Sequence, residues 1–180
     1  MLRAVGNVTL ARIHAEAGDE INTRLEELER AALRARGLTQ QLITFAKGGV
    51  PVRLPGTLPD LIRDATTFVL RGSNVRCTYK FPRDLWWAEF DQGQIIQVIQ
   101  NLIINADQAM PDGGVVTIEA QNVTVTDSYR LPLKAGRYIR IVVEDNGCGI
   151  PKENLPKIFD PFFTTKNNGS GFGLATAYSI

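Results

Sequence analysis

The most informative segment of this chain reads Glu144-Asp145-Asn146-Gly147-Cys148-Gly149-Ile150-Pro151. The mostly apolar residues 138–143 before it predict a strand, so Asp145 stands where a strand ends and a glycine-rich turn begins. Gly147 and Gly149 permit a sharp turn and the close approach of a flat ligand. A carboxylate held there can accept hydrogen bonds from an amino group such as that of adenine. Taken alone, the segment is equally compatible with a plain turn between a strand and a helix.

The composition excludes several classes of protein. The chain has 180 residues, 44% of them hydrophobic, which suits one domain with an appendage. Its 20 basic and 19 acidic residues give a net charge of +1, so nothing favours nucleic acid or an anionic membrane surface as a partner. No apolar run is long enough to span a bilayer, and we expect no signal peptide. Cys77, Cys148 and a single His make neither a disulfide framework nor a zinc pattern, so we expect a reducing, cytoplasmic setting.

Residues 1–48 predict a helical appendage. Within the long helical pattern of residues 20–47, apolar or small residues recur at alternating steps of four and three, as in a coiled coil. That helix would be about 40 Å long, and the short helix expected before it, residues 2–17, cannot cover its apolar seam. We therefore expect a partner helix from a second subunit, although a solvated connector helix is the alternative. The seam consists of Ile21, Leu25, Leu28, Ala32, Ala35, Thr39, Leu42 and Ala46.

A domain boundary is expected at Gly48-Gly49-Val50-Pro51, which breaks the helix and separates residues 1–48 from residues 49–180. The second domain should mix helices and strands, with the strand of residues 86–90 as the hairpin neighbour of the strand before it. A short helix, an irregular loop and a glycine-rich loop should follow Ile150. The longer expected elements are helices at 57–70 and 92–110, strands at 75–81, 86–90, 115–125 and 137–143, and the start of a last helix after residue 173.

Two amides stand out on the helix expected after Asp91. Asn101 and Asn105 are four residues apart, so both side chains should project from one face of the helix. An amide oxygen is a suitable ligand for Mg²⁺. The alternative is that both are ordinary solvent-facing residues.

Two segments near the end of the chain also have the character of a ligand site. In Asp160-Pro161-Phe162-Phe163-Thr164-Thr165-Lys166, adjacent aromatic residues could anchor a lid with Lys166 near phosphate, or form a small hydrophobic cluster under a loop. Gly169-Ser170-Gly171-Phe172-Gly173-Leu174 leads into a helix, where backbone N–H groups can cradle phosphate. No strand precedes this glycine-rich segment, which argues against a dinucleotide-binding fold.

These four segments occur in the order of the N, G1, F and G2 boxes of bacterial sensor histidine kinases, and the chain resembles that family over nearly its whole length. Residues 101–114 and the run from Phe162 to Lys166 are most similar to the nitrogen-regulator (NtrB-like) branch and its hybrid relatives. The resemblance implies an α+β fold of the Bergerat type, a two-layer α/β sandwich with a mixed sheet and helices on one face. A long helical hairpin would precede it.

The resemblance also implies a site for ATP and Mg²⁺. Asp145 would read the adenine amino group, with Gly147 and Gly149 shaping its pocket, while Asn105 would hold Mg²⁺ and Asn101 would lie beside the phosphates. The catalytic residues would be Asn101, Asn105 and Lys166. The other residues implied for the nucleotide site are Gln108, Ile150, Phe162, Thr165, Gly169, Ser170, Gly171, Phe172, Gly173 and Leu174.

By this resemblance the chain would transfer the γ-phosphoryl group of ATP to a His on the dimerisation helix, for relay to an Asp of a response regulator. Its partners would be a second copy, through residues 20–47, and the receiver domain of that regulator. Hydrolysing relatives such as gyrase B, MutL and the heat-shock chaperones carry Glu where this chain has Asn101, and an amide cannot act as a general base. The alternatives are an ATPase of the same superfamily, or an inactive module that only dimerises and docks the regulator.

The chain departs from the family pattern at both ends. The family's acceptor His has an acidic neighbour and lies on the first hairpin helix, so we expect it before Met1. The only His, His14, is followed by Ala15 near the expected hairpin turn, and we expect no phosphorylation of it. The chain stops at Ile180, whereas the family continues with two more strands. We therefore expect a catalytic fragment of a longer sensor, cytoplasmic itself and with no direct membrane contact, whether or not the parent chain is membrane-bound.

Overall fold

The computed structural model describes residues 51–126, 133–166 and 169–180. The expected hairpin, its seam and His14 lie outside the described residues. The chain divides into two compact units, and one of them comprises Gly49–Asp160 together with Gly173–Ile180. The other includes the loop Pro161–Phe172, which is treated below by itself.

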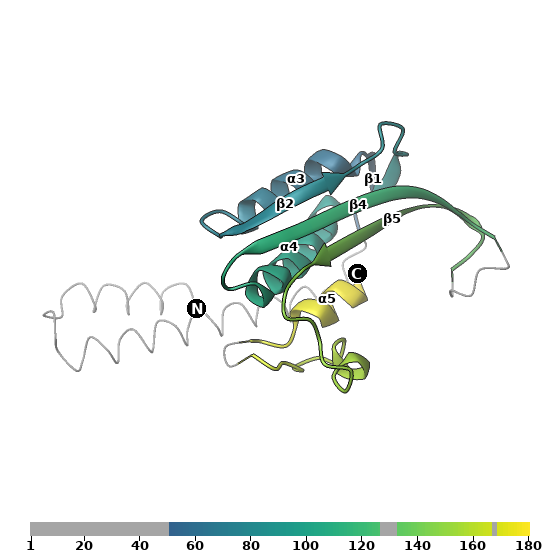
Figure 1. The fold of residues 1–180 in the computed structure, drawn as a ribbon. Coiled ribbons are helices and arrows are strands. Elements are labelled where there is room, and N and C mark those ends of the chain that lie inside the picture. Colours follow the sequence, from purple (N-terminus) through teal and green to yellow (C-terminus); the bar gives the residue numbers. More distant parts are fainter. Residues whose placement is uncertain (1–50, 127–132, 167–168) are drawn as a thin grey trace, which may run out of the picture. The chain divides into compact units, whose positions relative to one another are not determined.

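The larger unit combines strands with helices (Figure 1). Among the described residues, no helix has the length and apolar character needed to cross a membrane. In chain order the elements are β1 (Leu54–Gly56), α3 (Leu58–Val69), β2 (Val75–Lys80), β3 (Ala88–Phe90), α4 (Gln92–Ala109), β4 (Gly114–Val125), β5 (Gly136–Asp145), the 3-10 turn η1 (Leu155–Lys157) and α5 (Gly173–Ser179).

The main sheet of the unit has the strand order β2-β4-β5 and is mixed. β2 runs parallel to β4, with Val75 opposite Gly114, whereas β4 runs antiparallel to β5, with Val116 opposite Asp145. Parallel pairing requires a long crossover, and α4 lies within the connection that supplies it. The mixed sheet with helices packed on it confirms the predicted fold class for the part of the chain that the structure describes.

The predicted hairpin between the strands at 75–81 and 86–90 is wrong. β3 pairs instead with β1, in an antiparallel two-stranded sheet that places Gly56 opposite Ala88. The connection after β2 is too long for a tight hairpin, and Asn122 of β4 holds it by accepting from the Trp86 N–H at 2.9 Å and donating to the Asp84 carbonyl at 2.9 Å. Strand β1 was not expected from the sequence, because its Pro55-Gly56 pair is typical of a turn.

Helix α4 begins where its cap predicts. The Asp91 side chain accepts a hydrogen bond from the Gln94 N–H at 3.0 Å, which satisfies one of the free donors of the first turn. Its second carboxylate oxygen accepts from the Val52 N–H at 3.0 Å, so the same residue ties down the chain segment before β1. Asp91 therefore fixes both the start of α4 and the entry into the unit.

The hydrophobic core lies between the helices and one face of the sheet. Ile62 of α3, Ile103 of α4, and Val116 and Ile118 of β4 are fully buried. The opposite face of β2 carries the exposed residues 76, 78 and 80, so the sheet is covered on one side in the way a two-layer domain requires.

We expect Ile103→Ala to lower the free energy of unfolding by about 2–5 kcal/mol, because it leaves a cavity at a position that is 0% exposed. The matched control is Ile104→Ala on the same helix. That side chain is 42% exposed, so the loss should stay below about 1 kcal/mol. Urea unfolding followed by circular dichroism measures both, and equal losses would contradict the assigned inner face of α4.

Candidate active site

The turn after β5 is held in place by two side chains of its own. Asp145 is the last residue of β5, and one of its carboxylate oxygens, Oδ1, accepts the Gly147 N–H at 2.9 Å. The Asn146 side-chain oxygen accepts the Val115 N–H at 2.9 Å. A side chain that binds the backbone two residues ahead is a common device for tight turns, and here it orients the Asp145 carboxylate at the end of the strand.

The two glycines of the turn are required for different reasons. At Gly147 a Cβ atom would lie 2.7 Å from both the Cβ and the carbonyl oxygen of Ala109, so only glycine allows this close approach to the end of α4. The neighbouring Cys148 N–H donates to the Ala109 carbonyl at 3.2 Å. Gly149 instead has a φ of +72° and nothing within 4 Å of the position of its Cβ, so its conformation favours glycine while the space beside it is open.

Asn101 and Asn105 lie together on α4, next to the first residue of α5. A Cβ on Gly173 would lie 3.7 Å from Asn105 Nδ2 and 3.8 Å from the Cβ and Cγ atoms of Asn101. The Nδ2 atom of Asn101 is buried and has no hydrogen-bond partner among the described residues. Because a buried donor without an acceptor is costly, this amide requires an acceptor that the described protein groups do not supply.

The loop Pro161–Phe172 is closed by contacts between its own two ends. The Phe162 N–H donates to the Gly171 carbonyl at 3.1 Å, and the rings of Phe162 and Phe172 pack edge to face with centroids 4.4 Å apart. Gly171 has a φ of +69°, and a Cβ there would lie 2.3 Å from the carbonyl carbon of Phe162. Gly171 is thus required both by its conformation and by the closeness of Phe162.

Inside the loop, the Thr164 hydroxyl accepts the Lys166 N–H at 3.1 Å, and the Gly169 N–H donates to the Lys166 carbonyl at 3.1 Å. Phe162 itself has a φ of +70° and a side chain that is 70% exposed, an unusual conformation for an aromatic residue. The expected aromatic anchor is therefore a clamp between the ends of this loop.

The remaining predicted site residues are distributed over these same segments. Gln108 is exposed on α4, and Ile150 is exposed just after the turn at Gly149. Thr165 and Ser170 are exposed within the loop, while Leu174 is half-buried in the first turn of α5.

The described residues offer no cluster of three or more His, Cys, Asp or Glu side chains that could hold a metal ion. A cation that keeps most of its water and takes ligands from substrate phosphates needs only one or two protein oxygens, and this is the usual condition of Mg²⁺. An amide such as that of Asn105 fits such a role.

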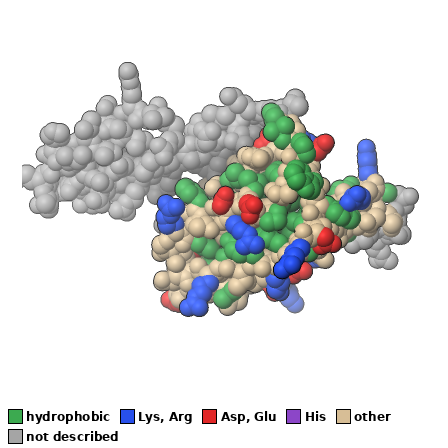
Figure 2. Space-filling view, turned by 90° about the horizontal axis from the view of Figure 1, so that it is seen from above, with side chains coloured by type: hydrophobic (Ala, Val, Ile, Leu, Met, Phe, Trp, Pro, Cys, Tyr) green, Lys and Arg blue, Asp and Glu red, His purple; other side chains and the backbone are tan. Residues whose placement is uncertain are grey.

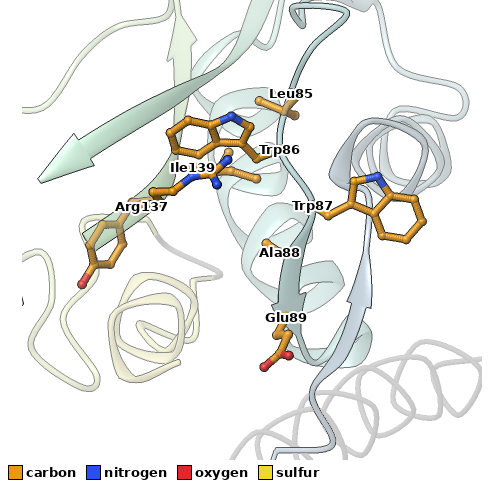
Figure 3. A pocket seen from close by; sticks show the side chains of 8 residues that line it. Leu85, Trp86, Trp87, Ala88, Glu89, Arg137 and Ile139 are labelled. Atoms are coloured by element: carbon orange, nitrogen blue, oxygen red, sulfur yellow. The ribbon is translucent and has the colours of Figure 1, made fainter. Parts of the chain in front are cut away.

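A cavity of about 750 Å³, which was not expected from the sequence, lies at the other end of β5. It is lined by Trp86, Trp87 and Glu89 and by Arg137 and Ile139 of β5 (Figure 3). The Arg137 guanidinium stacks on the Trp86 ring at 3.9 Å, so the positive charge serves to hold the loop before β3. The pair of adjacent tryptophans was the only signal of this cavity in the sequence.

The face of the described residues seen in Figure 2 carries charged side chains of both signs. On the face shown in Figure 2, Lys and Arg side chains are interspersed with Asp and Glu, and the described residues form no large basic area there. This agrees with the net charge of +1.

A mixed sheet covered on one side by helices, with a carboxylate at the end of one strand and two amides on the central helix, defines a two-layer α/β ligand-binding domain. Residues 90–180 match the family described as histidine kinase-, DNA gyrase B-, and HSP90-like ATPase. The chain belongs to this family.

Among curated proteins, the chain is 36% identical over 171 residues to the sensor kinase CckA of Brucella abortus (strain 2308), covering 91% of this chain and 18% of that protein. It is 34% identical over 141 residues to the sensory histidine kinase/phosphatase NtrB of Rhizobium leguminosarum bv. phaseoli, covering 73% of this chain and 35% of that one. The predicted resemblance to sensor histidine kinases is thereby confirmed.

Solved structures share the fold. Full-length ShkA in complex with AMPPNP matches with a TM-score of 0.67 and 20% identity, over 99% of this chain and 37% of that one. Histidine kinase ThkA in complex with the response regulator protein TrrA matches with a TM-score of 0.61 and 22% identity, over 91% of this chain and 47% of that one.

The exposure of the turn leads to a prediction about the relative reactivity of the two cysteines. Cys148 is exposed in the turn, whereas Cys77 of β2 is half-buried. Burial raises the pKa of the Cys77 thiol, and a hydrogen bond with Tyr79 offsets this only in part. Since the thiolate is the reactive species, we expect Ellman's reagent at pH 8 to modify Cys148 quickly and Cys77 slowly. Cys148→Ser should remove the fast phase of this reaction. If Cys77→Ser removed the fast phase instead, the described turn would be contradicted.

Proposed function

We propose that this chain is the ATP-binding catalytic part of a sensor histidine kinase, which transfers the γ-phosphoryl group of ATP to a histidine for relay to an aspartate of a response regulator. The observation that carries the proposal is the Asp145 carboxylate, oriented by the Gly147 N–H at the end of β5 in a chain of this ATPase family. ShkA, whose fold this chain shares, has been solved with the ATP analogue AMPPNP.

Adenine selection follows from the way Asp145 is held. With Oδ1 engaged by Gly147, the second oxygen, Oδ2, is left to accept from a donor outside the turn. The exocyclic amino group of adenine is such a donor, whereas guanine presents a carbonyl oxygen at the same ring position and would be repelled. The open side of Gly149 leaves room for a flat base, so the turn favours adenine over guanine.

The phosphates are proposed to lie against the two amides of α4. A phosphate oxygen would supply the acceptor that the buried Asn101 Nδ2 lacks. Asn105 would hold Mg²⁺ through its side-chain oxygen, and the ion, when bound, would neutralise charge on the phosphoryl groups. Gln108, Ile150, Phe162, Thr165, Lys166, Gly169, Ser170, Gly171, Phe172, Gly173 and Leu174 complete the proposed site.

Transfer is favoured over hydrolysis because of the residue type at position 101. Asn101 can orient a group through hydrogen bonds, but its amide cannot remove a proton from water at neutral pH. The bound nucleotide would therefore persist until an acceptor side chain arrives. An ATPase of the same superfamily is the second candidate, and a module that only dimerises and docks a regulator is the third.

The proposed partners follow from the same function. The chain spans 18% and 35% of the two curated relatives, so the activity of the whole protein is part of this proposal. We propose that a second copy of the chain binds the apolar seam that runs from Ile21 to Ala46. The receiver domain of a response regulator would bind the helical appendage, residues 1–48. The ThkA structure, which contains a response regulator, supports a response regulator as a partner.

The first test is nucleotide affinity. We expect Asp145→Ala to weaken binding of AMPPNP by about 2 kcal/mol or more, because it removes the charged acceptor for the base. Isothermal titration calorimetry in the presence of Mg²⁺ measures the loss. The control is Glu144→Ala, which removes the adjacent exposed carboxylate of β5 and should leave affinity unchanged. Equal affinity of Asp145→Ala and the parent chain would refute the assignment of Asp145.

The second test is turnover. We expect slow release of inorganic phosphate at saturating ATP and Mg²⁺, since Asn101 provides no general base. A coupled assay for free phosphate measures the steady-state rate. A turnover on the order of 10 per second, typical of an ordinary enzyme, would instead favour the ATPase.

A further inference from the structure

Asn146 lies where the end of β5 meets the end of α4 and the start of β4. Its side-chain oxygen accepts the Val115 N–H at the start of β4, while its backbone lies between the strand end at Asp145 and the close contact of Gly147 with Ala109. A Cβ on Gly114 would lie 2.7 Å from this same oxygen, so the glycine before Val115 leaves the space that the Asn146 side chain occupies.

The bond from Val115 to Asn146 extends the pairing of β4 with β5 by one residue. In the strand register Val116 lies opposite Asp145, the last residue of β5. Val115 precedes Val116 in β4, and its N–H donates to the side-chain oxygen of Asn146. It has no backbone acceptor there because the chain after β5 has already turned toward α4. Asn146 therefore allows the chain to leave the sheet immediately after Asp145 while the end of the ladder stays closed.

We propose that Asn146 is a positioning residue for the recognition of adenine: it fixes the direction in which the Asp145 carboxylate points. The inference rests on the proposed function, in which Asp145 accepts from the base. Asn146 acts through Asp145 and need not touch the nucleotide.

Asn146 is exposed, so water can replace its side chain as the partner of the Val115 N–H. Loss of the side chain should therefore change stability little. The direction of the neighbouring carboxylate is a stricter requirement, since a small displacement of a recognition group lowers affinity strongly. The expected signature is a loss of base discrimination in a chain that remains folded.

The experiment compares two nucleotides that differ only in the group that Asp145 would read. ADP carries the 6-amino group, and purine riboside 5′-diphosphate lacks it. Calorimetric titration of the 180-residue chain gives both dissociation constants, and the parent should prefer ADP by about tenfold or more. In Asn146→Ala this preference should fall to about threefold or less, mainly through weaker binding of ADP.

Two variants separate positioning from general stability. Asn146→Asp keeps an oxygen acceptor at the same place and should retain most of the preference for ADP. Asn122→Ala removes two hydrogen bonds between its side chain and the backbone, toward the other end of β4, so its melting temperature should fall at least as much as that of Asn146→Ala. Its preference for ADP should equal that of the parent.

Each outcome decides a separate point. If the parent binds neither nucleotide, or Asp145→Ala keeps the preference, the proposed function fails. If the parent and Asp145→Ala behave as expected but Asn146→Ala retains the full preference, the inference about Asn146 is overturned. An equal loss of preference in Asn122→Ala would also overturn it. Should Asn146→Ala not fold, Asn146→Ser, whose oxygen is one bond shorter, replaces it with the same criteria.

Discussion

The antiparallel ladder between β4 and β5 is the constraint on which the candidate site depends. The register that places Val116 opposite Asp145 also places Ile118 opposite Val143, both directed toward the core. With Ile118 kept on the helix side, a slip of β5 by one residue would turn Val143 away from the helices and move Asp145 to the other face of the sheet. The hydrophobic core and the orientation of the Asp145 carboxylate are therefore specified by the same set of backbone hydrogen bonds.

Helix α4 links this ladder to the second part of the site. Its inner face carries Ile99, Ile103 and Ala106, all nearly or fully buried, which fixes the rotation of the helix. That rotation brings Asn101 and Asn105 next to the start of α5. The carbonyl of its last residue, Ala109, accepts a hydrogen bond from the Cys148 N–H in the turn that follows Asp145. One helix thus supports both the proposed base-binding group and the proposed phosphate-binding amides, so changes in its packing would affect both.

Much of this could be predicted from the sequence, because the signals are local. Periodicity located α4, β4 and β5 to within a few residues, and the Asp91 cap is present as a hydrogen bond. The pairing of β3 with β1 could not be predicted, since the loop that leads into β3 is held by Asn122, 36 residues after Trp86. The cavity lined by Trp86, Glu89 and Arg137 could not be predicted either, because it brings together segments that are far apart in the sequence. The glycines at 147 and 149 were predicted as a pair, but only coordinates reveal that one is required by contact and the other by its φ angle.

The clamp between Phe162 and Gly171 has a consequence for the entropy of ligand binding. Because a hydrogen bond and a ring contact already join its two ends, the segment between them is a closed loop before any ligand arrives. A ligand that orders this segment therefore does not meet the entropic cost of bringing its ends together, which grows with the logarithm of loop length. The described residues of this loop form no helix or strand, yet the loop is in this respect preorganised, and more of the interaction energy remains available as affinity.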